Sequence, residues 1–251
     1  NTKNPEQNYR YAKEVKGADI LLHGNVVAMY GNAEINYDYT YINGADTLKH
    51  RKKIIELGDV KYNILAGKTI KDKYMEEYVN LHGKIVLEKG SLYDNFKYMV
   101  RNNIPTFNKD AHLNKIIKSK DVYFNLKCAK KIQGADILAH GRVVIENGSA
   151  ISNFMFLQIE GSDLNSHLEA IINSQDELVN AKCITEVEGC NIIRHARVVF
   201  NGADNNLKFE VLNWAKLHNK LNELKKLPQV NQFIEDIKIG RIKLNNNDYQ
   251  C

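Results

Sequence analysis

Histidine has the widest chemistry of the side chains in this sequence, since its imidazole ring binds metals and exchanges protons near neutral pH. The chain has eight, at regular intervals of roughly 23 to 32 residues: His23, His50, His82, His112, His140, His167, His195 and His218. A metal ion needs ligand nitrogens that converge to about 2.1 Å. Equivalent residues of stacked helical repeats lie about 10 Å apart and do not share an ion. We therefore expect no metal and no cofactor, and a packing histidine that hydrogen-bonds a neighbouring loop.

A second polar residue recurs in step with the histidines. Asparagine occupies the same position in seven successive segments: Asn8, Asn36, Asn63, Asn95, Asn125, Asn153 and Asn180. Its amide both donates and accepts hydrogen bonds. Two interpretations follow: the seven amides bind the main chain of an extended peptide, or each is buried and satisfies the turn of an adjacent repeat. The first makes these seven asparagines the candidate binding residues.

No residues form a pattern typical of catalysis. The sequence lacks a nucleophile elbow, an HExxH motif and a glycine-rich phosphate loop, so we predict a protein that is not an enzyme. The four cysteines, Cys128, Cys183, Cys190 and Cys251, have no metal-binding spacing. Cys128 and Cys183 fall at the repeat position of Tyr39 and are expected in the core. The cysteines suggest no disulfide framework, which favours an intracellular, cytoplasmic location.

The chain is organised by a repeat of about 28 residues. A phrase at 15–24, VKGADILLHG, returns at 132–141 as IQGADILAHG. The period divides the chain into eight units: 4–31, 32–58, 59–90, 91–120, 121–148, 149–175, 176–202 and 203–229. We predict that residues 4–229 form one repeat array, because no linker interrupts it.

Each unit has the signals of two short helices. A capping residue opens the first helix four residues before the repeated asparagine: Asn4, Asn32, Asp59, Ser91, Asp121, Ser149 and Asp176. The Gly-Ala-Asp phrase then ends this helix with a glycine and caps the second with an aspartate. In the second helix, histidine lies on the apolar face, as in His50 with Ile54 and Ile55. The pattern predicts an all-α fold, an α-solenoid of about eight helix-turn-helix repeats.

Several segments depart from the repeat. Unit four contains Pro105, with Asn108 expected as the cap of its second helix, and unit eight has Trp214 but no Gly-Ala-Asp phrase. We expect a terminal helix in residues 230–244 and a loose tail from Asn245, so that 230–251 caps the array.

The phrase resembles a known kind of repeat. Tyr9, Tyr11, Ala12 and Val15, followed by Gly-Ala-Asp-Ile at 17–20, resemble the short α-hairpin repeats of certain bacterial and viral proteins. The resemblance covers residues 4–202 and implies an array of stacked helical hairpins. It implies no activity and carries over no functional residue.

Charge and hydropathy limit the classes of partner that the sequence favours. No run of 18 apolar residues occurs, so no membrane span is expected. Residues 1–125 carry 20 Lys/Arg and 15 Asp/Glu, while residues 126–251 carry 15 of each, so the net charge of +5 comes from the first half. Only 7 of the 35 basic residues are Arg, the residue favoured for phosphate recognition. Arg51, Lys52 and Lys53 are expected on an exposed helix face.

These observations predict a non-enzymatic scaffold that binds a partner protein or peptide along an extended concave face. One alternative is a helical-repeat protein that binds nucleic acid through basic residues 1–125. Another is a structural repeat segment of a longer protein.

Overall fold

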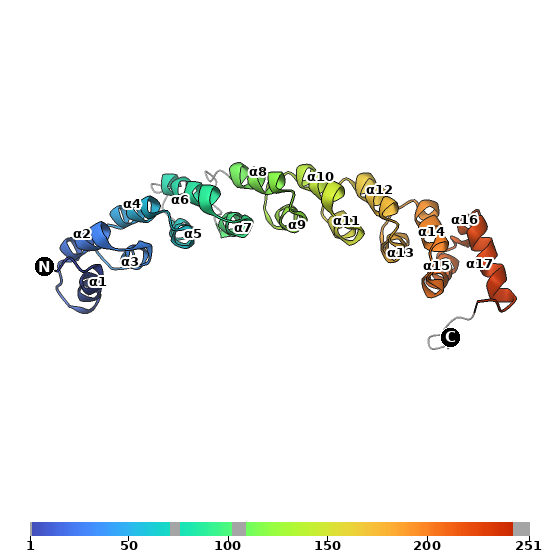
Figure 1. Ribbon diagram of the computed structural model, residues 1–251, viewed down its shortest axis with the longest axis horizontal. Coiled ribbons are helices and arrows are strands. Elements are labelled where there is room, and N and C mark those ends of the chain that lie inside the picture. Colours follow the sequence, from blue (N-terminus) through green and yellow to red (C-terminus); the bar gives the residue numbers. More distant parts are fainter. Residues whose placement is uncertain (1, 71–75, 102–108, 243–251) are drawn as a thin grey trace. The chain divides into compact units, whose positions relative to one another are not determined.

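The fold is entirely helical in the part of the chain that the structure describes. The computed structural model describes residues 2–70, 76–101 and 109–242. These residues contain 17 helices and no strand, which confirms the predicted all-α fold (Figure 1). Pro105 and Asn108, like Asn245 and the tail, lie outside the described residues.

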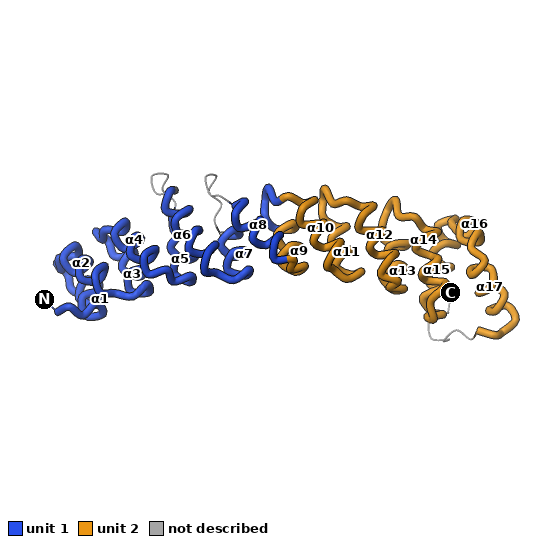
Figure 2. The backbone as a smooth tube through the Cα atoms, turned by 45° about the horizontal axis from the view of Figure 1, so that its top comes forward, with its two compact units in different colours: residues 1–119, 131–135 blue, residues 120–130, 136–251 orange. Residues whose placement is uncertain are grey.

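The helices belong to two compact units (Figure 2). Unit 1 comprises residues 1–119 and 131–135, and unit 2 comprises residues 120–130 and 136–251. The helices of unit 1 are α1 (Pro5–Glu14), α2 (Ile20–Tyr30), α3 (Ala33–Tyr39), α4 (Thr47–Leu57), α5 (Val60–Lys68), α6 (Glu76–Lys89), α7 (Leu92–Arg101) and α8 (Lys109–Ser119). Those of unit 2 are α9 (Val122–Lys131, whose last residue belongs to unit 1), α10 (Ile137–Asn147), α11 (Ala150–Leu157), α12 (Leu164–Ser174), α13 (Glu177–Glu186), α14 (Ile192–Asn201), α15 (Asn205–Leu217), α16 (Leu221–Leu224) and α17 (Pro228–Lys238).

Each of the first seven predicted repeats contains one helix pair, from α1 and α2 to α13 and α14. We call the odd-numbered member of each pair the first helix and the even-numbered member the second helix. The eighth repeat differs, because α15 has 13 residues and α16 has only four. The terminal helix was predicted over 230–244 but extends over Pro228–Lys238. Proline at its first position favours an earlier start, and Gly240, with φ of 72°, follows its end.

The predicted caps form as expected. Asp19, Asp46, Asp136 and Asp163 each accept, through Oδ1, the backbone N–H three residues further on at 2.9–3.2 Å. The first helices are capped in the same way, since Asp59 accepts from the Tyr62 amide and Asp176 from the Val179 amide. These bonds satisfy first-turn amides that have no partner within the helix.

The loop glycines explain why the Gly-Ala-Asp phrase recurs. Gly17, Gly44, Gly134, Gly161 and Gly189 have φ between 79° and 83°. Side chains with a Cβ rarely adopt this left-handed conformation, whereas glycine does so without strain. The glycine therefore reverses the chain between the two helices of a repeat, and the following aspartate or asparagine begins the second helix.

Helix contacts within each unit are local along the chain. Among the described residues of unit 1, the main helix contacts join helices one or two places apart, for example α1 with α2 and α3. Unit 2 follows the same rule, except that α14 also contacts α17. In both views the first helices of unit 2 lie on one side and its second helices on the other (Figures 1 and 2). The first helices α9, α11, α13 and α15 thus share one side of the unit.

Candidate functional site

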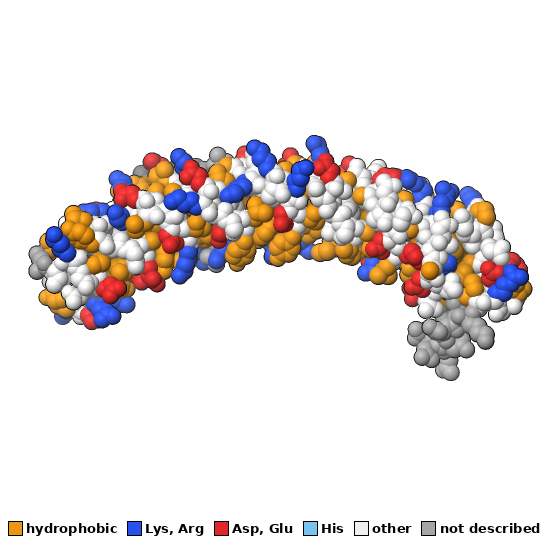
Figure 3. Space-filling view, in the orientation of Figure 1, with side chains coloured by type: hydrophobic (Ala, Val, Ile, Leu, Met, Phe, Trp, Pro, Cys, Tyr) orange, Lys and Arg blue, Asp and Glu red, His pale blue; other side chains and the backbone are white. Residues whose placement is uncertain are grey.

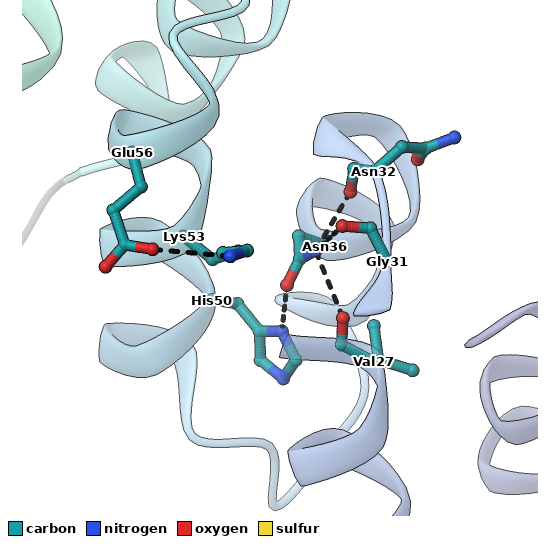
Figure 4. A network of polar contacts seen from close by, with 7 residues as sticks. All are labelled: Val27, Gly31, Asn32, Asn36, His50, Lys53 and Glu56. Atoms are coloured by element: carbon teal, nitrogen blue, oxygen red, sulfur yellow. Dashed lines mark hydrogen bonds and ion pairs between the residues drawn. The ribbon is translucent and has the colours of Figure 1, made fainter. Parts of the chain in front are cut away.

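The two recurring polar residues form buried pairs. In each of the first seven repeats the histidine of the second helix donates from Nδ1 to the asparagine Oδ1 of the first helix, at 2.6–2.8 Å. Figure 4 shows one pair, Asn36 with His50. The histidine was expected to bond a neighbouring loop, and this prediction is wrong. Its partner is the asparagine on the facing helix of the same repeat.

The asparagine amide nitrogen links neighbouring repeats. In all seven repeats Nδ2 donates to the backbone carbonyl four residues earlier, at the start of the first helix, at 2.7–3.0 Å. In five it also donates to a carbonyl of the preceding second helix; Asn36 reaches Val27 O at 3.3 Å and Asn180 reaches Ile171 O at 3.1 Å. One side chain therefore connects three segments of backbone.

This arrangement favours the structural interpretation of the asparagines. The side chains of Asn8, Asn36, Asn63, Asn95, Asn125, Asn153 and Asn180 are at most 4% exposed. Both polar atoms of each amide are bonded within the protein. A peptide cannot reach these atoms unless the helices separate, so we do not retain the seven asparagines as binding residues. They hold the repeats together instead.

The hydrogen bonds also fix the tautomer of each paired histidine. Because Nδ2 of the asparagine donates to carbonyls, its Oδ1 faces the ring and Nδ1 of the histidine carries the proton. The other ring nitrogen, Nε2, is then an acceptor. In His82, His140, His167 and His195 this atom is buried and has no hydrogen-bond partner.

Burial keeps six of the paired imidazoles neutral. Desolvation lowers the pKa of His50, His112, His140, His167 and His195 to about 4, and that of His82 to about 3. Among the charges that act on His82, the Arg51 cation lowers its pKa further. These rings are neutral packing groups at neutral pH.

A ring commonly stacks on the paired histidine. The residue three positions after the asparagine supplies it: Tyr39 stacks on His50 with centroids 4.5 Å apart, and Phe156 on His167 at 4.7 Å. Cys128 and Cys183 occupy the same repeat position. Both are fully buried, as predicted, and burial raises the pKa of each thiol to about 12.

The residues that the structure describes contain no cluster of three or more His, Cys, Asp or Glu side chains placed to hold a metal ion.

One basic residue lies elsewhere than expected. Arg51 was predicted on an exposed face with Lys52 and Lys53, but it is 6% exposed. Its guanidinium donates to the carbonyl of Ala66 and to Oγ1 of Thr69. Arg51 thus ties α4 to the end of α5.

The exposed face of the first helices varies strongly between repeats. Its residues lie two positions before the buried asparagine and two and five positions after it, which places them on one helical stripe. In unit 2 these residues define the first-helix face: Tyr123, Lys127, Lys130, Ile151, Met155, Gln158, Leu178, Lys182 and Thr185. Hydrophobic side chains are visible along the side of the molecule where α9 and α11 lie (Figure 3).

Three large apolar residues recur at one position of this face. Tyr123, Ile151 and Leu178, on α9, α11 and α13, are 58%, 45% and 56% exposed. None of the three was predicted from the sequence to be a binding residue. The signal was present, because an apolar residue two positions before the buried asparagine lies opposite the packed side of its helix.

The comparisons with known proteins give no match. No family model, no curated protein and no solved structure matches this chain. In addition, no helix in the described ranges is both long and apolar enough to cross a membrane.

Proposed function

We propose that this chain is an α-solenoid whose stacked repeats act as a non-enzymatic protein-interaction scaffold. The exposed apolar row Tyr123, Ile151 and Leu178 supports this proposal most strongly. Large side chains at equivalent positions of three successive first helices form a regular apolar surface, and such surfaces are typical of protein interaction sites. The first-helix face of unit 2 is the proposed contact surface.

The contrast between interior and surface also supports a scaffold. The asparagine–histidine pair is the same in seven repeats, because it performs the same structural task in each. The position two residues before the asparagine instead holds Glu6, Glu34, Lys61, Tyr93, Tyr123, Ile151 and Leu178 in turn. A constant interior with a variable exterior lets each repeat present a different side chain to a partner.

Site-specific photo-crosslinking tests the proposal. Ile151 is replaced by p-benzoylphenylalanine, and the full chain is irradiated in nuclease-treated lysate of the source cells. We expect discrete protein adducts, because a partner bound to the first-helix face lies within reach of the probe.

The matched control places the same probe at Leu138, which is 50% exposed but lies on α10, a second helix. Adducts at position 151 that are absent at 138 agree with the proposal. Equal adduct patterns at both positions, or none at 151, contradict it.

Nucleic acid is the second candidate partner, and one observation favours it. In unit 1, Lys97 Nζ lies 5.5 Å from the ring centroid of Tyr93, which is 53% exposed. Tyrosines beside lysines can stack on bases and contact phosphates. Fluorescence anisotropy with a labelled single-stranded oligonucleotide tests this candidate. Steeply salt-dependent binding that weakens on Tyr93→Ser favours nucleic acid.

A further inference from the structure

The spacing of the apolar row limits the conformation of a bound peptide. Tyr123, Ile151 and Leu178 lie on neighbouring first helices, which pack about 10 Å apart. A polyproline II segment has three residues per turn and a rise of about 3.1 Å per residue, so every third side chain faces the same way at intervals of about 9.3 Å. An extended peptide with an apolar residue at every third position therefore matches the row.

Cations lie beside the two ends of the apolar row, on α9 and α13. Lys127 and Lys182 lie four residues after Tyr123 and Leu178, which is about one helical turn along the same stripe. Lys130 lies a further turn along α9 and is exposed. Lys127 Nζ is 4.2 Å from the centroid of the Tyr123 ring, so one cation directly adjoins the first apolar anchor.

The first-helix face of unit 2 contains three lysines and no carboxylate. Glu177 directly precedes Leu178, and its two carboxylate oxygens accept the backbone N–H groups of Ala203 and Asp204. The same stripe in the first two repeats of unit 1 carries Glu6, Glu34 and Asp38. The corresponding stripe of unit 1 also includes basic residues: Arg10, Lys13, Lys61, Lys68 and Lys97. It is therefore mixed in charge, whereas the charged residues of the unit 2 face are all cations.

We propose that the first-helix face of unit 2 binds an acidic peptide in an extended conformation, with apolar residues at every third position and carboxylates between them. The apolar side chains pack on Tyr123, Ile151 and Leu178. The carboxylates pair with the neighbouring lysines. This inference deepens and depends on the proposed scaffold function, because it names the class of partner for the same surface.

Fluorescence anisotropy with synthetic peptides tests the pairing. The probe is a fluorescein-labelled peptide of about twelve residues, long enough to cross three helices, with leucine at every third position and glutamate and serine between. One comparison peptide replaces each glutamate with lysine, and another moves the leucines to every fourth position. We expect both changes to weaken binding to the full-length chain at least about tenfold.

Protein variants locate the binding site. Leu178→Ser is expected to weaken the acidic peptide about tenfold, and Lys182→Glu about three- to tenfold. Lys182→Glu is also expected to improve binding of the lysine peptide. The matched control is Arg10→Glu on α1 of unit 1. Arg10 is exposed and occupies the same repeat position as Lys182, so the substitution makes the same charge reversal outside the proposed site. Circular dichroism shows whether each variant keeps its helices.

The outcomes distinguish a failure of the peptide inference from a failure of the proposed scaffold function. The inference is overturned if the lysine peptide binds as tightly as the acidic one, if leucine spacing has no effect, or if Arg10→Glu weakens binding as much as Lys182→Glu. If the acidic peptide does not bind while crosslinking at position 151 still captures a protein, the partner class is wrong and the scaffold function stands. If crosslinking also fails, both are wrong.

Discussion

The asparagine–histidine pair explains how a polar group can occupy the interior of every repeat. A buried amide or imidazole is costly unless it is hydrogen-bonded. Asn153 meets this requirement with Val144 O at 3.4 Å, Ser149 O at 3.0 Å and His167 Nδ1 at 2.7 Å. These partners belong to the preceding second helix, the start of its own helix and the facing helix. A single side chain thus sets the position of three segments.

Replacement of Asn153 by leucine tests this role. Leucine has a similar size but leaves the Nδ1–H of buried His167 without an acceptor, and each unsatisfied buried group costs about 1–3 kcal/mol. We expect Asn153→Leu to lower the free energy of unfolding by about 2–4 kcal/mol in urea titrations. The matched control is Asn173→Leu, at an exposed position of α12. An equal loss in the control would show that the pair has no special role.

The sequence showed that asparagine and histidine each recur in the repeats, but it did not show that they pair with each other. The separation between partners varies from 14 residues for Asn36 and His50 to 19 for Asn63 and His82, because the intervening segments differ in length. A fixed offset, which is the usual signal of contact, was therefore absent. The burial of Arg51 was equally hidden, since its acceptors, Ala66 O and Thr69 Oγ1, come from another repeat.

A single helical hairpin is an incomplete element in this protein. Gly24 of α2 packs on the next repeat, where an added Cβ would lie 3.0 Å from Tyr39 and 3.2 Å from His50 Nε2. Tyr39 is fully buried by this contact. Tyr11, its equivalent in the first repeat, is 50% exposed. Each hairpin therefore completes the burial of the next one, which short helices need because they are marginal alone.

The connection within each hairpin depends on backbone conformation. Gly161 has φ of 82°, and an added Cβ would have no neighbour within 4 Å, so a substitution there acts through the backbone alone. We expect Gly161→Ala to cost about 1–2 kcal/mol of stability in thermal or urea unfolding, and Gly161→Asn less, because asparagine tolerates the left-handed region. Glu160→Ala, at the exposed neighbouring position, is the control. Equal effects of alanine and asparagine would contradict the explanation.

The elements were easier to predict than the contacts. Local signals such as Gly161 and the cap Asp163 act within a few residues, so the sequence alone located both ends of the inter-helix loops. The lack of strands followed from the same signals. The end of α17 was harder to predict, because it lies outside the repeat.

The paired histidines make the stability of the whole molecule depend on pH. In six of them, burial lowers the folded-state pKa from the ordinary value of 6.5 to about 4, or to about 3 for His82: His50, His82, His112, His140, His167 and His195. Between these limits the unfolded chain binds more protons than the folded chain, so stability falls as the pH is lowered. Each histidine contributes up to about 1.4 kcal/mol per pH unit in this window.

Urea unfolding from pH 7 to pH 4 measures this dependence. We expect the unfolding midpoint to fall steadily below about pH 6.5 and to recover when the pH is raised again. His167→Gln is expected to reduce the slope, whereas Asn173→Leu, at an exposed position of the same helix, leaves it unchanged. A midpoint that stays constant down to pH 4 would contradict the burial of neutral imidazoles.

The local contacts of unit 2 predict that whole repeats are removable. Residues 149–175 contain α11 and α12, and α13 begins with its own cap, Asp176. Gly141 of α10 packs on Phe156 and His167 of the deleted repeat. After the deletion Gly141 would face Cys183 and His195, which occupy the same repeat positions as Phe156 and His167. The control deletion, residues 149–162, removes α11 alone and places two second helices in succession.

We expect the repeat deletion to keep the helical circular dichroism per residue and to melt cooperatively at a lower temperature. Stability in a repeat array is approximately a sum of repeat and interface contributions, so removal of one repeat lowers it without abolishing the fold. The half-repeat deletion is expected to lose the helicity of unit 2, because Asn153 is removed and His167 has no facing partner. Loss of helicity in the repeat deletion, or retention in both, would show that the repeat is not the unit of folding.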